Sequence, residues 1–334
     1  MRIHAYAAPE AHAPLEAHEF EAAAPGPQEV LIKVSHCGLC HSDLHLIDND
    51  WRNSQYPLVP GHEVVGTVLQ MGEAVQHLQA GQRVGVGWQA GSCLACEACL
   101  KGEENLCRQS QATCVGRPGG FADHLLVDAR FAFPIPDALS SVDAAPLLCA
   151  GVTVYAPLRR YNVRAWHKVA ILGIGGLGHL ALQFAHAMGC EVTALSSSPN
   201  KKAEAHSLGA DHFVNTRAQG ALTQLRSSFD FILVAATADL DWKPYVKALR
   251  PNGRLCFVTG EHSLIDVPLA MLLDGQKSIS GSIIGGRAMM SEMLEFAARH
   301  QIRATTECLP IADVNTALDK VRNNAARYRM VLKM

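Results

Sequence analysis

The sequence has no run of like charge and no long uninterrupted apolar segment. Its 29 basic and 31 acidic residues leave a net charge of -2, which does not favour a nucleic-acid-binding surface. The longest apolar stretch, Ala144 to Leu158, is interrupted by Pro146 and Pro157 and is too short to span a bilayer. The opening segment MRIHAYAAPEAHAP has no apolar core of a secretory signal. We therefore expect a cytoplasmic protein whose partner is neither a nucleic acid nor a membrane.

The length and composition of the chain suit two globular domains. It has 334 residues, of which 49% are hydrophobic and 18% are charged. Up to about residue 133, short strand patterns alternate with glycine and proline, as in an all-β domain. From residue 168, strand and helix patterns alternate, including a polar helix expected between the strand patterns at 212–215 and 229–236. This alternation predicts an α/β domain with a doubly wound parallel sheet.

The end of the chain returns to a helix, a strand, a helix opened by Asp313 and a last strand. We expect this tail to complete the first domain. The predicted boundaries are therefore residues 1–146 with 288–334 for the first domain and residues 147–287 for the second.

Four cysteines gather on one short segment. The gaps between Cys93, Cys96, Cys99 and Cys107 are two, two and seven residues. Thiolates at this spacing can close a tetrahedral zinc site on a single loop. A disulfide cluster is the alternative, but without a secretory segment a metal is favoured. The segment therefore predicts a structural zinc site.

A glycine-rich turn separates the first strand and first helix of the α/β domain. The motif GIGGLG follows the strand pattern KVAIL and precedes a helix with an apolar face. Glycines at this junction allow a tight turn and close approach of the backbone to a pyrophosphate, which the helix N-terminus attracts. A plain turn is the alternative. The predicted dinucleotide-binding residues are Gly173, Gly175, Gly176, Leu177 and Gly178.

The second strand of this domain lacks an acidic residue at its end. An NAD-selective site places Asp or Glu there to bind the ribose hydroxyls, whereas this chain has Ser196, Ser197 and Lys201 in this region. Hydroxyl groups and an ammonium suit a 2′-phosphate, which a carboxylate would repel. The sequence therefore favours NADP(H). The alternative is that the serines cap the next helix and the lysine is solvated.

Three further segments contain cysteine and histidine. They are Cys37 to His45, Pro60 to Glu63, and the segment around Cys149. Alone, each is ambiguous, because Cys149 fits a buried small residue and a CxxC pair fits redox chemistry. The remaining cysteines lie outside these segments and are expected to be small buried residues; they are Cys114, Cys190, Cys256 and Cys308.

Together these motifs resemble the zinc-dependent medium-chain dehydrogenases. GLCHSDLH, VPGHEVVG, the four-cysteine segment, LLCAGVT and GIGGLG occur in the order of that superfamily, and the likeness covers essentially the whole chain. YPLVPGHE, SSSPNKK and ISGSIIGG make the chain most similar to cinnamyl-alcohol-dehydrogenase-like, NADP-dependent aldehyde reductases. The resemblance implies a GroES-like catalytic domain and a Rossmann nucleotide-binding domain.

The resemblance also implies a catalytic zinc site. Cys40, His62 and Cys149 match its three ligands, and a fourth position would stay open, as in catalytic zinc sites. Glu63 matches a residue that approaches the metal during ligand exchange, and Asp43 a carboxylate that orients the histidine ring. Both acids could instead be ordinary surface residues.

Further residues take roles from the same resemblance. Ser42 matches the hydroxyl that touches the substrate oxygen, and His45 matches the end of a proton relay, although a surface histidine is the alternative. Cys37 is not expected to bind metal. Thr153 and Ile283 are predicted to contact the cofactor, and the residues predicted to line the substrate cleft are Trp51, Trp88, Ile283, Ile284 and Met289.

The resulting prediction is an enzyme that reduces aldehydes with NADPH and holds two zinc ions per subunit. Hydride passes to a zinc-polarised carbonyl, and the segment Ser278 to Ile284 is expected to pair across a homodimer. Three alternatives remain: oxidation of an alcohol or polyol, a non-catalytic NADPH-binding zinc-redox sensor, and a structural zinc adaptor. The physiological substrate does not follow from the sequence.

Overall fold

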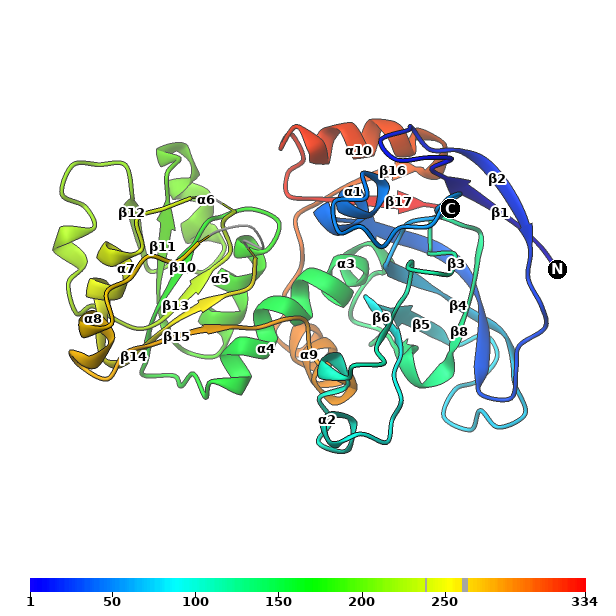
Figure 1. Ribbon diagram of the computed structural model, residues 1–334, viewed down its shortest axis with the longest axis horizontal. Coiled ribbons are helices and arrows are strands. Elements are labelled where there is room, and N and C mark those ends of the chain that lie inside the picture. Colours follow the sequence, from blue (N-terminus) through cyan, green and yellow to red (C-terminus); the bar gives the residue numbers. More distant parts are fainter. Residues whose placement is uncertain (238, 260–263) are drawn as a thin grey trace. The chain divides into compact units, whose positions relative to one another are not determined.

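The chain folds into two compact units in this computed structural model, which describes residues 1–237, 239–259 and 264–334 (Figure 1). One unit contains Met1–Val152 and Ile284–Met334, and the other contains Thr153–Ile283. These limits differ by a few residues from the predicted boundaries, which followed the strand and helix patterns alone.

The first unit is built on a seven-stranded sheet. Its strands are β3 (Glu29–Leu39), β4 (Glu63–Met71), β5 (Arg83–Val86), β8 (His124–Asp128), β9 (Phe133–Pro134), β16 (Thr306–Pro310) and β17 (Arg329–Lys333). The order is β16, β17, β3, β4, β5, β9, and β8 also pairs with β3. Figure 1 shows the C-terminal strand β17 beside the early strand β3, to which it is antiparallel. The tail therefore completes the sheet of the first unit.

Smaller elements surround this sheet. A hairpin joins β1 (Arg2–Ala7) to β2 (Glu16–Glu21), and a short ladder joins β6 (Gln89–Gly91) to β7 (Gln111–Ala112). The helices are α1 (His41–Ile47), α2 (Glu97–Leu100), α3 (Ser141–Pro146), α9 (Arg287–Arg299) and α10 (Val314–Arg322). Apolar residues of the sheet, of β1, of α1 and of α10 share one core, which includes Ile32, Val64 and Leu332.

The second unit is a parallel sheet with helices between its strands. The strands are β10 (Lys168–Leu172), β11 (Glu191–Ser196), β12 (His212–Asn215), β13 (Phe229–Val234), β14 (Leu249–Phe257) and β15 (Ser278–Gly281). The helices are α4 (Val152–Arg160), which begins at the last residue of the first unit, α5 (Gly178–Ala187), α6 (Lys202–Ser207), α7 (Lys243–Ala248) and α8 (Ala270–Leu273). The order β12, β11, β10, β13, β14, β15 is that of a doubly wound dinucleotide-binding sheet, which confirms the predicted fold class.

Two local predictions are wrong. The polar segment before β13 forms only a short 3-10 turn, Thr223–Leu225, because Gly220 takes a positive φ of 74° that interrupts a helix. Cys308 is exposed rather than buried, because it lies on β16 at the edge of the first sheet, where side chains can face solvent.

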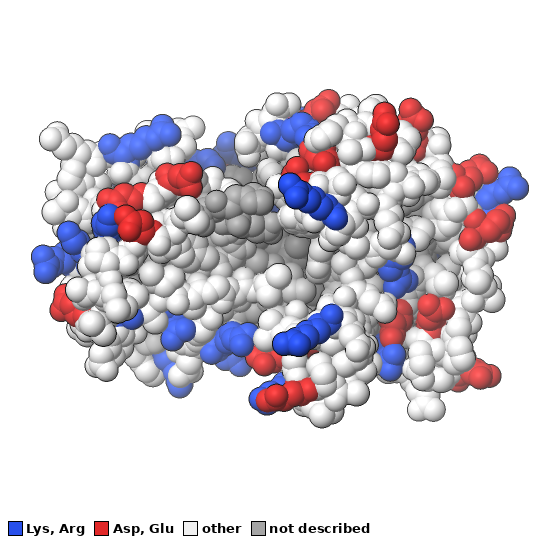
Figure 2. All heavy atoms as spheres, in the orientation of Figure 1, with Lys and Arg blue, Asp and Glu red and all other residues white. Residues whose placement is uncertain are grey.

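The apolar stretch from Ala144 to Leu158 lies in a longer helical run, Ser141–Arg160, of 20 residues. By length and composition alone this run could cross a membrane. However, 78% of its most apolar window is buried inside the fold, as in the core helix of a soluble protein. Charged side chains of both signs are spread over the face shown in Figure 2. That no membrane or nucleic acid binds stays a prediction.

Candidate active site and cysteine lobe

Cys40 is held where β3 ends and α1 begins. It is the N-cap of α1, with its Sγ accepting a hydrogen bond from the backbone N–H of Ser42 at 3.3 Å. Its own N–H donates to Asp43 Oδ2 at 3.0 Å, so Cys40 and Asp43 form a reciprocal capping box. The strand-to-helix junction therefore fixes the thiol without help from a metal.

Asp43 also fixes His62. Its Oδ1 accepts a hydrogen bond from the N–H of Gly61 at 3.0 Å and lies 3.0 Å from His62 Nδ1. Both side chains are completely buried. With its proton on Nδ1, the imidazole presents Nε2 to Cys40 Sγ, 3.1 Å away. Asp43 is thus placed as the orienting carboxylate that the resemblance implied.

Cys149 lies close to Cys40 and His62 and belongs to a π-helical turn, Leu147–Gly151. Gly87 lets this turn approach, because a Cβ there would lie 2.5 Å from the carbonyl oxygen of Leu148. The ligand atoms of Cys40, His62, Glu63 and Cys149 lie within 4.8 Å of one another. Two thiols and an imidazole nitrogen at this separation match the donor set of a three-ligand zinc site.

The charges of this buried centre are coupled. A hydrogen bond with Cys149 lowers the pKa of Cys40 well below its usual value, although burial opposes the shift. The same contact, together with burial, raises the pKa of Cys149. Burial by itself lowers the pKa of His62, but Asp43 and the two cysteines outweigh it and raise that pKa. A divalent cation bound here would hold both cysteines as thiolates and the histidine neutral.

Glu63 is paired with an arginine that the sequence analysis missed. Arg329, the first residue of β17, donates from Nη2 to Glu63 Oε1, and both side chains are buried. Burial raises the pKa of Glu63 to about 7, although the charge of Arg329 opposes the shift. Glu63 Oε2 has no hydrogen-bond partner among the residues that the structure describes. No local motif marks Arg329, because its distance from Glu63 in sequence is 266 residues.

Aromatic rings lie next to this centre. The ring of Trp88 stands edge-on to His62, with 4.9 Å between centroids, and that of Trp51 edge-on to Trp88 at 5.7 Å. The ring of His45 is 5.3 Å from that of Trp51, and its Nδ1 lies 2.7 Å from Asp50 Oδ2. Trp88 also lines a narrow recess together with Leu148, Ile284 and Met290. The roles of Ile283 and Met289 in the cleft stay predictions.

Two further cysteines are buried close to the ligands. Burial raises the pKa of Cys37 well above its usual value, which disfavours its thiolate. Cys114 lies nearer to the centre than the sequence suggested, because its Sγ is within 4.8 Å of ligand atoms of Asp43 and His62. Burial raises its pKa as well. Neither thiol belongs to the group formed by Cys40, His62, Glu63 and Cys149.

The four-cysteine segment forms a compact lobe around α2, which we call the cysteine lobe (residues 93–107). The Sγ atoms of Cys93 and Cys99 are 3.9 Å apart, those of Cys96 and Cys99 3.6 Å, and those of Cys107 and Cys93 3.5 Å. Tetrahedral zinc with bonds of about 2.3 Å places sulfur atoms roughly 3.8 Å apart. Hydrogen bonds from the backbone N–H groups of Ala95 and Cys96 lower the pKa of Cys93 to about 6. The lobe therefore fits one zinc ion with all four positions filled.

The glycine-rich turn lies between β10 and α5. Gly173 has a φ of +90°, and a Cβ on Gly178 would lie 1.8 Å from the carbonyl oxygen of Gly173, so both positions require glycine. A Cβ on Gly175 would meet no atom within 4 Å, so this part of the turn is open. Lys201 Nζ donates to the carbonyl oxygen of Ile174. The ammonium thus lies beside the turn that would hold a dinucleotide.

Ser196 and Ser197 differ in exposure. Ser196 is buried at the end of β11, and its Oγ accepts a hydrogen bond from the N–H of Ser198 at 3.2 Å, whereas Ser197 is exposed. Thr153 is buried in α4, and Ile283 is 60% exposed after β15. The cofactor roles of these four residues stay predictions.

Comparison with known proteins decides the family. Residues 26–137 match the alcohol dehydrogenase GroES-like domain, and residues 176–299 match the zinc-binding dehydrogenase domain. Aldehyde reductase AdhA from Synechocystis sp. is 43% identical over 99% of this chain and 98% of its own length. The chain belongs to the zinc-binding alcohol dehydrogenase family. The predicted enzyme class, an alcohol dehydrogenase or aldehyde reductase, is therefore confirmed.

Solved structures agree with this assignment. The enzyme superposes on a cinnamyl alcohol dehydrogenase from Sorghum bicolor with a TM-score of 0.93 and 37% identity, covering 100% of this chain and 98% of that one. It superposes on the CAD of Helicobacter pylori, complexed with NADP(H), with a TM-score of 0.91 and 31% identity and the same coverage. The predicted resemblance to cinnamyl-alcohol-dehydrogenase-like enzymes is confirmed.

Proposed function

We propose that this enzyme reduces aldehydes to primary alcohols with NADPH and holds two zinc ions per chain. The observation that carries the proposal is the convergence of Cys40, His62 and Cys149 within 4.8 Å in a buried centre whose histidine is already oriented by Asp43. Three protein donors leave one position for a substrate oxygen, whereas the cysteine lobe fills all four positions of its own site.

When bound, zinc supplies Lewis acidity toward a carbonyl oxygen, and the reduced nicotinamide supplies the hydride. The chain's own residues do the rest. The thiolates of Cys40 and Cys149 offset the charge of the cation, and Ser42, two residues after Cys40, is proposed to give its hydroxyl proton to the product oxygen. His45 is proposed to resupply that proton, with its Nδ1 side held by Asp50 at 2.7 Å. Glu63 is proposed to approach the metal with Oε2 during ligand exchange.

The cofactor proposal depends on the region after β11. Lys201 lies beside the glycine-rich turn through its contact with Ile174, and this region has no carboxylate to repel a 2′-phosphate. The relative complexed with NADP(H) supports the same choice. Lys201→Ala removes a charged hydrogen bond worth about 1.5 to 3 kcal/mol, so the KM for NADPH should rise roughly tenfold to a hundredfold. The KM for NADH should stay nearly unchanged, and equal efficiency of the unmodified enzyme with both cofactors would contradict the proposal.

The substrate is proposed to be an aldehyde with an apolar or aromatic body. The rings of Trp51 and Trp88 next to His62 form an apolar surface against which the apolar part of such a substrate can pack. The test is turnover of NADPH with a panel of aldehydes at neutral pH, compared with NADP⁺ and the matching alcohols and polyols. Faster turnover of the alcohols would favour the oxidative alternative, and no turnover of either would favour a sensor.

Ser42→Ala tests the proton step separately. General acid-base groups contribute typically about 10²- to 10⁴-fold, so the kcat for aldehyde reduction should fall by at least a hundredfold. His45→Ala should lose less, because water can replace the end of a relay. Zinc content and NADPH affinity should survive both changes. Full activity of the Ser42→Ala enzyme would leave the metal centre standing but refute this proton route.

The chain is further proposed to form a homodimer through the segment Ser278–Ile284. Its strand β15 lies at the edge of the second sheet, and nearby apolar side chains, Leu269, Leu273 and Ile283, are 60 to 72% exposed. Light scattering should give about twice the chain mass of 35.9 kDa. Ile279→Pro should shift the protein toward monomer, and a monomeric unmodified protein would refute the proposal.

A further inference from the structure

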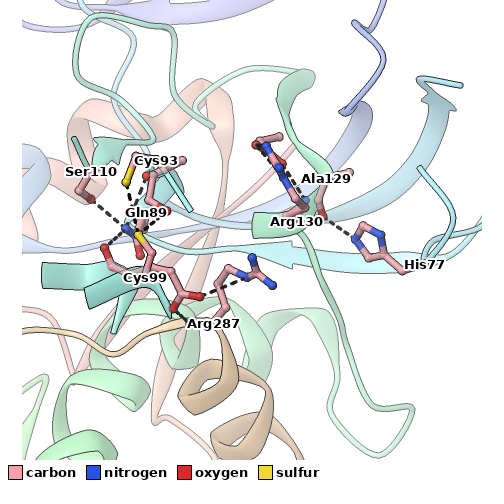
Figure 3. Close-up of polar contacts among 12 residues, drawn as sticks. His77, Gln89, Cys93, Cys99, Ser110, Ala129, Arg130 and Arg287 are labelled. Carbon is pink, nitrogen blue, oxygen red and sulfur yellow. Dashed lines mark hydrogen bonds and ion pairs between the residues drawn. The ribbon is translucent and has the colours of Figure 1, made fainter. Parts of the chain in front are cut away.

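Glu104 is a buried carboxylate inside the cysteine lobe. It lies between Cys99 and Cys107 and is 5% exposed, whereas the side chain of Glu97 in the same lobe is 84% exposed. The backbone carbonyl of Glu104 accepts a hydrogen bond from Gln89 Nε2 at 2.7 Å. Figure 3 shows Gln89 beside Cys99 and Ser110, with Arg287 below them. Burying a carboxylate costs free energy unless a partner compensates for the lost hydration. The contacts of Glu104 therefore indicate what role it has in the fold.

The partner of Glu104 is the first turn of α9. Its Oε2 accepts a hydrogen bond from the backbone N–H of Arg287 at 3.0 Å, and its Oε1 lies 3.7 Å from Arg287 Nε. The N-cap residue of α9 is Gly286, which has no side chain to cap the helix. Glu104 thus supplies the missing cap and a negative charge at the positive end of the helix dipole, from a distance of 183 residues in sequence.

The lobe also packs directly on the start of α9. A Cβ on Gly286 would lie 2.0 Å from the carbonyl oxygen of Gly102 and 2.7 Å from Glu104 Oε2. Only glycine fits at this position. A shift of the lobe backbone would therefore be transmitted to the start of α9, because the carbonyl oxygen of Gly102 is in direct contact with the backbone of Gly286.

The other contacts of α9 lead to the turn that carries Cys149. Met293 is fully buried, and its Sδ lies 3.2 Å from the position that a Cβ of Gly151 would take, at the end of the Leu147–Gly151 turn. Met290 Cε lies 3.0 Å from the corresponding point at Gly87, where the carbonyl oxygen of Leu148 is 2.5 Å away. Close-packed side chains thus connect the helix to both sides of Cys149.

We propose that Glu104 is a positioning residue that couples the cysteine lobe to the Cys149 turn through the start of α9. The inference rests on the proposed function, because it assumes that Cys149 binds a metal. In this view the lobe does more than stabilise its own loop. With a metal bound to its four thiols, the lobe would hold Glu104 in place, Glu104 caps α9, and α9 sets the position of Cys149 relative to Cys40 and His62.

The test replaces zinc by cobalt and compares the unmodified protein with Glu104→Ala, Glu104→Gln and Glu97→Ala. Visible absorption bands that are absent from a Cys149→Ser protein report the buried centre. In Glu104→Ala these bands should shift while both metals remain bound. The buried metal should also pass to a chromogenic chelator about tenfold faster, in line with the loss of one helix cap. Glu104→Gln keeps an acceptor oxygen and should restore the band positions and most of the slow release.

Glu97→Ala removes an exposed carboxylate of the same lobe and should match the unmodified protein in both measurements. Unmoved bands and an unchanged release rate in Glu104→Ala would overturn the coupling and leave the proposed function intact. Loss of the lobe metal alone, with the Cys149-dependent bands unmoved, would overturn it as well. If the unmodified and Cys149→Ser proteins gave the same spectrum, the proposed metal centre would fail and the coupling with it.

Discussion

The four thiols of the cysteine lobe all lie within residues 93–107, whereas the proposed metal ligands of the buried centre are residues 40, 62 and 149 on three separated segments. In the lobe, cysteine thiols are the only proposed ligands, and Cys93 and Cys96 are partly exposed. In the buried centre, the capping box of α1, the Asp43–His62 contact and the Glu63–Arg329 pair fix the side chains around the ligands. We therefore expect the lobe to need its metal to fold, whereas contacts within the rest of the unit hold the side chains of the buried centre.

The largest expected effect comes from Cys149→Ser. Loss of the buried metal removes several kcal/mol of charge stabilisation in the transition state, and about 1.4 kcal/mol is a factor of ten in rate. We therefore expect kcat/KM for aldehyde reduction to fall by at least about 10³-fold. Metal analysis should show one zinc instead of two, and the circular dichroism spectrum should be unchanged.

The matched control for this experiment is Cys114→Ser, which changes a neighbouring buried thiol outside the ligand group of Cys40, His62, Glu63 and Cys149. It should keep two zinc ions. A Cys149→Ser protein that unfolds would contradict the view that the fold, rather than the metal, holds the buried centre.

Cys107→Ser should mainly reduce the stability of the fold, whereas Cys149→Ser should mainly reduce activity. Loss of one ligand from a closed structural site belongs to the large stability effects, about 4 kcal/mol or more, which corresponds to a fall in Tm of roughly 8 °C or more. The protein should lose the lobe zinc and become sensitive to proteolysis between residues 93 and 107. Metal analysis, a thermal melt and limited proteolysis check this. A Cys107→Ser protein with one zinc missing and a normal Tm would contradict the view that the lobe, unlike the buried centre, depends on its metal for stability.

The same distinction explains what the sequence could predict. The lobe was predictable from spacing alone, because its four thiols are neighbours in sequence. Prediction of the buried centre needed a family resemblance, because Cys40 and Cys149 are too far apart in sequence to form a recognisable metal-ligand motif. The strand and helix patterns indicated the parallel sheet, since its buried strands and glycine-ended helices are local signals. They missed α1, whose start is marked only by the capping pattern of Cys40 and Asp43.

Contacts between residues far apart in sequence could not be predicted, because they depend on the tertiary fold. Arg329 makes a buried ion pair with Glu63, and the buried carboxylate of Glu104 pairs with the partly exposed Arg287. Nothing near Arg329 or Glu104 in sequence predicts its partner. Cys308 was misjudged because cysteine is usually buried, whereas the exposure of a residue on an edge strand depends on tertiary pairing.

The smallest expected effect concerns the ion pair that supports α1, the helix proposed to carry the proton relay. Asp48 lies at the C-cap of α1, and its Oδ1 accepts from Arg322 Nη2 of α10 at 3.0 Å. Burial by itself would raise the pKa of Asp48, but the hydrogen bond and charge of Arg322, with a smaller contribution from His12, lower it. Arg322 is about half exposed, so the pair should stabilise the fold by about 1 kcal/mol at most.

The sign of the pH dependence follows from that lowered pKa. A carboxyl whose pKa is lower in the folded state stabilises the protein above its unfolded pKa of about 3.9, and this contribution disappears as the pH falls through the folded value. The unfolding free energy of Asp48→Asn should therefore lie below that of the unmodified protein at pH 5.5. The gap should narrow below about pH 4, as measured by urea denaturation of both proteins in parallel. A gap that stayed constant or widened below about pH 4 would show that Asp48 does not stabilise the fold through its charge.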